Sequence, residues 1–165
     1  MSTRPNSPVS LSLLDRLTDE EPKSPTAEAQ LTRAESVRAL KDGVRRDLEW
    51  LLNSRRCPIE PAPSAKELWR SVYCYGLPDI TGVSLSKGED RNKMARMVET
   101  VVATFEPRLL NVTVSMKPVA QDSHVLRFQI EALLRTEPAP SRVFFDTTLE
   151  LTKGEYEVAG ETRAR

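Results

Sequence analysis

Residues 94–116 read MARMVETVVATFEPRLLNVTVSM and carry the clearest structural signal in the chain. After Pro107 the apolar residues alternate with polar ones, as on a half-buried strand. The sequence therefore predicts a helix that ends near Phe105 and a strand that begins just after Glu106-Pro107-Arg108. Before Pro107 the apolar residues recur at steps of three and four, which buries one side of a helix; they are Met94, Met97, Val98, Val101, Val102 and Phe105.

Two more helices are predicted upstream from their start signals. Thr32-Arg33-Ala34-Glu35 fits a capping box, in which the hydroxyl and the carboxylate bond free backbone N–H groups. Ser64-Ala65-Lys66-Glu67 repeats this pattern before a short helix, and Ser86-Lys87-Gly88-Glu89 repeats it before the helix described above. Gly43 should weaken the first helix slightly. The apolar face of that helix comprises Val37, Leu40, Val44, Leu48, Leu51 and Leu52.

Alternating segments dominate the second half of the chain. Residues 126–132 and 143–151 alternate apolar and polar side chains, and Lys153-Gly154 predicts a tight turn into a last short strand. Helices come first and strands follow. We therefore predict an α+β fold in which N-terminal helices pack on a C-terminal antiparallel β-meander, as a single domain over residues 32–159.

The two ends of the chain differ from this domain in composition. Residues 1–31 are rich in Pro, Ser, Thr and charge, which predicts a flexible N-terminal segment. Within it, Leu13, Leu14 and Leu17 would share one face of a helix too short to be stable alone. We expect this short helix to dock on another surface, and residues 160–165 to form a loose tail.

Composition argues against several functional classes. Lys and Arg number 24, as do Asp and Glu, so no uniform positive field indicates nucleic-acid binding. No apolar run approaches the roughly 20 residues that cross a bilayer, and residues 1–19 lack a signal-peptide core. We therefore expect a cytoplasmic protein without membrane insertion. Cys57, Cys74 and the lone His124 lack metal-site spacing, so we predict two reduced thiols, a strand-entry histidine, no metal and no cofactor.

The position of Glu106 raises the question of catalysis. A lysozyme-like hydrolase needs a general acid, but Arg108 close by favours the ionised carboxylate instead. The sequence contains no phosphate-loop, serine-hydrolase or zinc-protease motif. Pro107 pushes Glu106 to the end of the helix, where an exposed negative charge costs about 0.3 to 1 kcal/mol. Either Arg108 compensates this charge in an ordinary solvated pair, or a partner chain does.

Several separated segments together resemble the TssE family of type VI secretion baseplate subunits. That family is related to phage-tail baseplate wedge proteins once labelled lysozyme-like. The order and spacing of the segments agree from residue 13 to about Val158. The segments are LLDRL at 13–17 with Glu21-Pro22, RDLEWLLN at 46–53, residues 71–79 with YGLPD, and FEPRL at 105–109.

The resemblance implies a structural protein without catalytic residues. The family's Glu-Pro-Arg motif falls on Glu106, Pro107 and Arg108, a motif implicated in seating the subunit against the baseplate wedge. The implied partners are TssF and TssG in the wedge, TssK through that wedge, and the contractile sheath of TssB and TssC. Sheath strands would pair with an exposed edge of the sheet formed by residues 109–158.

A second group of candidate partner-binding residues lies in the N-terminal segment. Leu13, Leu14 and Leu17 would help TssF and TssG to hold the subunit. The alternatives to this interpretation are a peptidoglycan-cleaving, lysozyme-like hydrolase and an adaptor unrelated to secretion.

Overall fold

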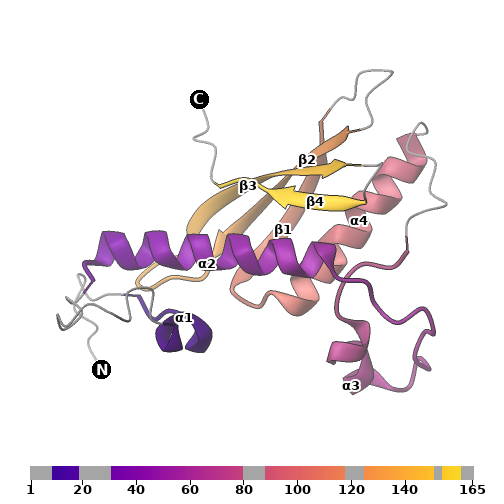
Figure 1. The fold of residues 1–165 in the computed structure, drawn as a ribbon, viewed down its shortest axis with the longest axis horizontal. Coiled ribbons are helices and arrows are strands. Elements are labelled where there is room, and N and C mark those ends of the chain that lie inside the picture. Colours follow the sequence, from indigo (N-terminus) through magenta and orange to yellow (C-terminus); the bar gives the residue numbers. More distant parts are fainter. Residues whose placement is uncertain (1–8, 19–30, 80–87, 118–124, 151–153, 161–165) are drawn as a thin grey trace.

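The computed structural model of this protein describes residues 9–18, 31–79, 88–117, 125–150 and 154–160. Within them, helices precede strands along the chain (Figure 1). The helices are α1 (Leu13–Leu17), α2 (Arg33–Asn53), α3 (Lys66–Trp69), the 3-10 helix η1 (Val72–Cys74) and α4 (Gly88–Phe105). The strands are β1 (Leu109–Met116), β2 (Val125–Leu134), β3 (Ser141–Glu150) and β4 (Glu155–Val158).

The four strands form one antiparallel sheet in the order β1-β2-β3-β4. Each strand pairs with the next one in the sequence, and Ile130 of β2 lies opposite Phe145 of β3. Gly154 enters β4 with a φ of 68°, a left-handed conformation that glycine adopts without steric cost. The predicted α+β fold, with N-terminal helices and a C-terminal antiparallel meander, is confirmed.

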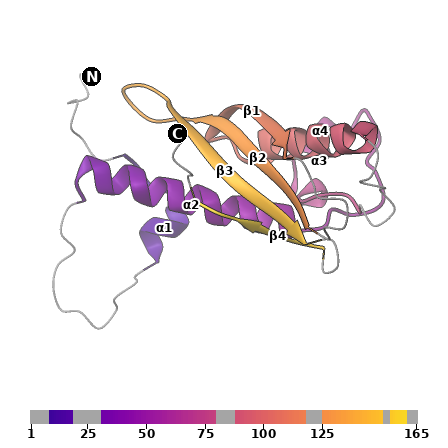
Figure 2. The same cartoon turned by 90° about the horizontal axis from the view of Figure 1, so that it is seen from above.

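One face of the sheet carries the hydrophobic core. Along β2, Leu126, Phe128 and Ile130 are buried on this face, and the residues between them alternate to the other face. The helix α2 packs beside β4 and α4 packs beside β1 (Figure 2). Both long helices therefore contribute to one continuous core.

The start of α2 follows the predicted capping box. The Glu35 N–H donates to Thr32 Oγ1 at 3.3 Å, and the Thr32 N–H donates to Glu35 Oε2 at 2.8 Å. The predicted apolar face is buried from Leu40 onward, and Val37 is half-buried. This helix was therefore predicted correctly from local signals alone.

The capping box predicted at Ser64 is wrong. Helix α3 begins one residue later than expected, with Ala65 at the N-cap position and no side-chain cap. The Ser64 carbonyl instead accepts a hydrogen bond from the Lys66 N–H at 3.0 Å, which places Ser64 in the preceding turn. The helix lasts one turn before η1 follows, and Val72 is 87% exposed.

Some predictions fall outside the described residues. They concern the cap at Ser86, the strand-entry histidine His124, and Leu151 at the end of the predicted strand 143–151. The flexibility predicted for residues 1–31 and the loose tail at 160–165 likewise stay predictions.

Candidate docking site at the helix–strand junction

The junction between α4 and β1 is a tight turn built on the helix end. The Glu106 N–H completes the last helical turn by donating to the Val102 carbonyl at 2.9 Å. The Leu109 N–H then donates to the Glu106 carbonyl at 3.1 Å. Pro107 follows Glu106 in this turn and is exposed. The turn thus presents the proline at the surface while it directs Glu106 inward.

Glu106 is buried, with 4% of its surface exposed. Its carboxylate accepts hydrogen bonds from Arg108 Nε at 2.7 Å, from Arg108 Nη2, and from the Arg108 N–H at 3.1 Å. Such a bidentate pair is stronger than a single charged bond. The ordinary solvated pair considered from the sequence is therefore wrong. Local spacing does not reveal the Tyr75, Phe105 and Leu51 side chains that line the surrounding hollow.

Arg108 also reaches helix α2. Its Nη2 lies 2.5 Å from Asp47 Oδ2, so one guanidinium joins two carboxylates that are far apart in the sequence. The hydrogen bonds that Arg108 donates to Glu106 have the largest influence on its pKa; together with the bond that it donates to Asp47, they outweigh its burial and raise the pKa of Arg108. Arg108 therefore stays charged and holds the junction against α2.

The same network continues from Asp47 to the N-terminal segment. Arg46 Nη2 lies 3.1 Å from Asp47 Oδ1 and 2.7 Å from Asp15 Oδ1. Ser12 Oγ donates to Asp15 Oδ2 at 2.6 Å. Burial opposes the ionisation of Asp15, but the hydrogen bonds from Ser12 and Arg46 outweigh it and lower its pKa. Five charged side chains therefore connect the junction to α1.

Gly43 makes this contact possible. A Cβ at position 43 would lie 2.9 Å from Asp15 Oδ2, closer than side chains pack. The sequence suggested only that Gly43 weakens α2, whereas the structure shows that it makes room for α1. The Val9 N–H adds a bond to Ser36 Oγ at 2.9 Å, and Leu11 packs against the core. Polar contacts and two apolar residues thus fasten residues 9–18 to α2.

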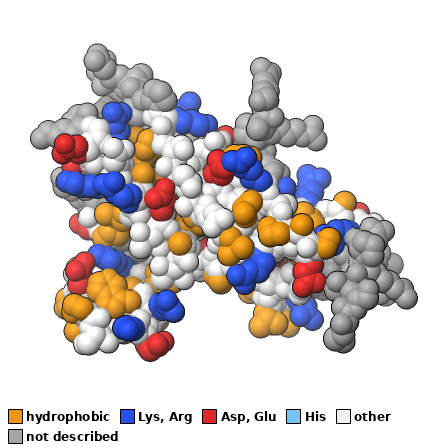
Figure 3. Space-filling view, turned by 180° about the vertical axis from the view of Figure 1, so that it is seen from behind, with side chains coloured by type: hydrophobic (Ala, Val, Ile, Leu, Met, Phe, Trp, Pro, Cys, Tyr) orange, Lys and Arg blue, Asp and Glu red, His pale blue; other side chains and the backbone are white. Residues whose placement is uncertain are grey.

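The leucines of α1 do not take part in this fastening. Leu13, Leu14 and Leu17 are 73%, 50% and 83% exposed. Trp50 of α2 is 53% exposed, and the Arg46 guanidinium lies 5.1 Å from its ring centroid. Viewed from behind, hydrophobic side chains reach the surface at the protrusions formed by α1 and α3 (Figure 3).

The structure brings the N-cap of α1, directly before the predicted leucines, to the predicted junction residues. A surface hollow of about 350 Å³ joins Ser12, which caps α1, to the junction. We call this hollow, with the leucines of α1 and Trp50 beside it, the docking face. The hollow is lined by Ser12, Asp47, Leu51, Tyr75, Phe105, Glu106, Pro107 and Arg108.

Sequence reasoning missed most of the connecting residues. Arg46 and Asp47 were noted only within a family-like segment, and Asp15 only between leucines. Their helical spacing was the available signal, because residues three and four apart share a helix face. Gly43, Arg46, Asp47 and Trp50 fit that spacing on α2.

Other candidate sites are sparse in the described part of the chain. No three His, Cys, Asp or Glu side chains there are grouped so that they could hold a metal ion. Cys57 and Cys74 are free thiols, and Cys74 is buried. None of the described helices has the length and apolar content that a membrane crossing requires.

Comparison with known proteins identifies the family. Residues 38–139, more than half of the chain, match the family of the baseplate wedge protein gp25. A chain of "The baseplate complex from the type VI secretion system" is 19% identical, with a TM-score of 0.48, over 67% of this chain and 94% of that chain. No curated protein matches the chain. The relationship to baseplate wedge proteins expected from the sequence is confirmed, and the chain belongs to the gp25 family of baseplate wedge proteins.

Proposed function

We propose that this chain is a structural, non-enzymatic subunit of a type VI secretion baseplate, held in the wedge by TssF and TssG through the docking face. Membership of the baseplate wedge family supports the structural role. The segments that resemble TssE support the type VI assignment. TssK would be reached only through the wedge, and the protein would work in the cytoplasm at a membrane-docked baseplate.

The observation that carries the proposal is the closed network at the junction. Both carboxylate oxygens of Glu106 accept bonds from Arg108, and Arg108 also bonds Asp47. A general acid must present a proton to its substrate, whereas this carboxylate is already bonded on both oxygens. The network is suited to hold Pro107 and α1 in fixed positions.

The neighbouring apolar residues are suited to partner contact. Burial of an exposed leucine side chain stabilises by roughly 1.5 to 3 kcal/mol, and three such leucines project from α1. Trp50 is a residue type enriched in binding hot spots. A rigid polar base with an apolar surface beside it fits a docking role.

Co-purification with TssF and TssG tests the docking face. Replacement of Leu13, Leu14 and Leu17 by serine should reduce recovery of both partners at least tenfold without unfolding the domain, because these side chains are exposed. Val72→Ser is the matched control, since Val72 is 87% exposed on η1. Equal recovery with the triple variant and with Glu106→Ala or Arg108→Ala would refute the docking role.

A direct assay separates the structural role from the hydrolase alternative. The purified chain is expected to release no reducing ends from peptidoglycan. Turnover that disappears in Glu106→Gln would overturn the proposal. Recovery of neither baseplate nor sheath proteins from a bacterial lysate would instead favour an unrelated adaptor.

The second part of the proposed function is templating of the contractile sheath. Residues 32–159 would act as one wedge domain whose sheet edge offers backbone groups to strands of TssB and TssC. Residues 1–31 would serve as a docking arm, and residues 160–165 would form a loose tail. Support comes from the four-stranded antiparallel sheet, whose edges are the places where strand addition can occur.

A further inference from the structure

Strand β3 is longer than the strand beside it. β3 runs for ten residues, whereas β4 has four and pairs only with Thr147–Glu150. One residue beyond this pairing, the Ala159 N–H donates to the Asp146 carbonyl at 2.8 Å. Among the described residues, no strand pairs with the outer edge of β3 from Ser141 to Phe145.

The backbone of this segment faces outward at alternate residues. The bond from Ala159 shows that the Asp146 carbonyl points away from β2. In an antiparallel sheet the direction of the backbone groups repeats every second residue. Phe144 and Arg142 therefore direct their N–H and C=O groups to the same outer edge, where a further strand could bond them.

Side chains bond outward backbone groups at the other sheet edges. Asn53 of α2 accepts from the Tyr156 N–H and donates to the Tyr156 carbonyl, both at 2.8 Å, as a neighbouring strand would. Arg45 donates to the Val158 carbonyl at 3.3 Å. On β1, Glu99 accepts from the Val114 N–H at 2.8 Å. Such caps hinder strand pairing at these edges.

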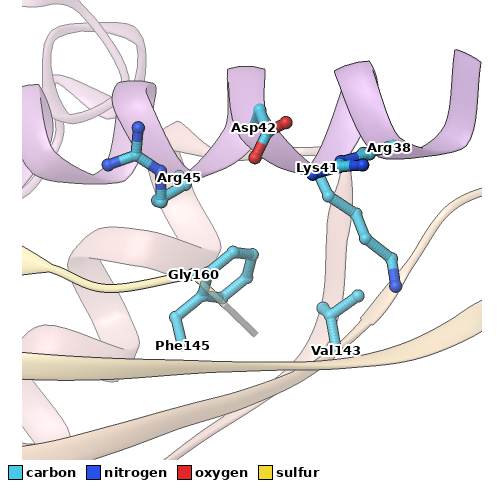
Figure 4. A pocket seen from close by; sticks show the side chains of 7 residues that line it. All are labelled: Arg38, Lys41, Asp42, Arg45, Val143, Phe145 and Gly160. Atoms are coloured by element: carbon cyan, nitrogen blue, oxygen red, sulfur yellow. The ribbon is translucent and has the colours of Figure 1, made fainter. Parts of the chain in front are cut away.

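The open edge of β3 is bordered by a positively charged stretch of α2. Between them lies a pocket of about 270 Å³, which we call the edge slot (Figure 4). Three cations and one anion line it; Arg45 is paired with Glu49 at 3.5 Å, whereas Arg38 forms no ion pair with the described residues. The edge slot is lined by Arg38, Lys41, Asp42, Arg45, Val143, Phe145 and Gly160.

We propose that the edge slot receives an extended acidic segment of an assembly partner, which adds to β3 at Ser141–Phe145 in line with β4. Its backbone bonds the outward groups of Arg142 and Phe144. A carboxylate of this segment faces Arg38, the slot cation that forms no ion pair with the described residues. This inference rests on the templating part of the proposed function and specifies which edge is used and what the strand carries.

The chain's own last residues are the competing source of a strand. They contain Glu161 as well as Arg163 and Arg165, so cations outnumber anions in this segment, as they do around Arg38. Like charges oppose this pairing. A chain that ends at Gly160 should therefore still template sheath, and loss of sheath in that variant would contradict a partner strand.

A proline substitution tests the edge directly. Phe144→Pro removes an outward N–H and leaves the bonds to β2 in place, because proline is tolerated where the N–H faces outward. Phe144→Ala is the matched control, since it removes the side chain and keeps the N–H. With a fluorescent sheath subunit in cells, Phe144→Pro should reduce assembled sheaths at least tenfold relative to Phe144→Ala.

A charge reversal provides a second, independent variant if Phe144→Pro does not fold. Arg38→Glu alters an exposed residue of the slot, and Arg96→Glu makes the same change on the exposed side of α4. Only Arg38→Glu should reduce sheath number. Normal sheaths with Arg38→Glu, or with a folded Phe144→Pro, would overturn the slot.

Recovery of TssF and TssG separates this inference from the proposed function. Both slot variants should retain these partners, because the docking face lies elsewhere on α2. If a slot variant retained TssF and TssG and also formed normal sheaths, the role of the edge slot would be refuted and the proposed function would stand. Failure of the unaltered chain to recover TssF and TssG would refute the proposed function itself.

Discussion

Helix α2 has two charged surfaces that are built differently. At Arg46 and Asp47, every charged side chain of the network that runs from Glu106 and Arg108 to Asp15 has an oppositely charged partner. At the edge slot, cations outnumber anions, and Arg38 forms no ion pair with the described residues. The same residue types therefore serve two purposes. Charged side chains that are paired within the chain hold elements together, whereas the charge of Arg38 is available to a partner.

Removal of Arg108 should have the largest effect on stability. Arg108→Ala leaves the buried Glu106 carboxylate without its cation, which should cost about 3 to 5 kcal/mol. Urea unfolding measures this loss, and Arg38→Ala should change stability by less than about 0.5 kcal/mol. Glu106→Gln in the Arg108→Ala background should recover part of the loss. If Arg108→Ala and Arg38→Ala changed the free energy of unfolding equally, the two charged surfaces of α2 would not differ in their structural role.

Alkaline pH tests β4, the strand that continues the line of the slot. Burial raises the pKa of Tyr156 from 10 to about 12, against a smaller opposing effect of Arg55. The folded state therefore holds this proton more tightly than the unfolded state. The contribution of Tyr156 to the free energy of unfolding is fully present below pH 10. The free energy of unfolding should fall by about 2 to 3 kcal/mol between pH 10 and 12.

Tyr156→Phe is the control for the alkaline measurement. Phenylalanine keeps the ring and removes the titrating hydroxyl, which is buried and has no hydrogen-bond partner among the described residues. Chemical unfolding at several pH values should show a flatter dependence in this variant. The same pH dependence of the free energy of unfolding in both proteins would mean that the Tyr156 hydroxyl is not buried under β4 packing in solution.

An alanine at position 43 separates the fold of α2 from the attachment of α1. Gly43→Ala should favour the helix by up to about 1 kcal/mol, while its Cβ displaces the Asp15 carboxylate. Hydrogen exchange should become faster at the Thr18 amide, which bonds the Leu14 carbonyl. Unchanged exchange at Thr18 would show that α1 does not depend on this close contact.

The smallest effect is expected at the outer end of the network. Asp15→Asn should cost about 1 kcal/mol or less, because the Asp15–Arg46 pair is partly exposed. The pKa of Asp15 is lowered from its ordinary value of 3.8. Its contribution is therefore present above pH 3.8 and disappears as the pH falls through the folded value.

Thermal unfolding between pH 5 and pH 2 checks this last prediction. The unaltered chain and Asp15→Asn should differ most at pH 5 and converge at the acid end. Ser12→Ala should give a smaller version of the same change, because it removes one hydrogen bond to the carboxylate. A constant difference across this range would exclude Asp15 as the titrating group.

The elements of the fold could be predicted from the sequence because their signals are local. The helical spacing before Phe105, the alternation after Pro107 and the capping box at Thr32 each involve residues close in the chain. The order of helices and strands then indicated an antiparallel meander. Such signals fail at Ser64. Its segment matches the capping-box pattern, but Ser64 lies in the preceding turn and does not cap α3.

Local sequence patterns are sufficient to predict the helix–strand switch at Glu106-Pro107-Arg108 and the candidate residues around it. The packed fold is needed to see that Glu106 is buried, that Arg108 reaches Asp47, and that Gly43 makes room for Asp15. It also shows which sheet edge has no partner strand among the described residues. The physical reason is distance along the chain, because these contacts join residues tens of positions apart and form only when α2, α4 and the sheet pack together.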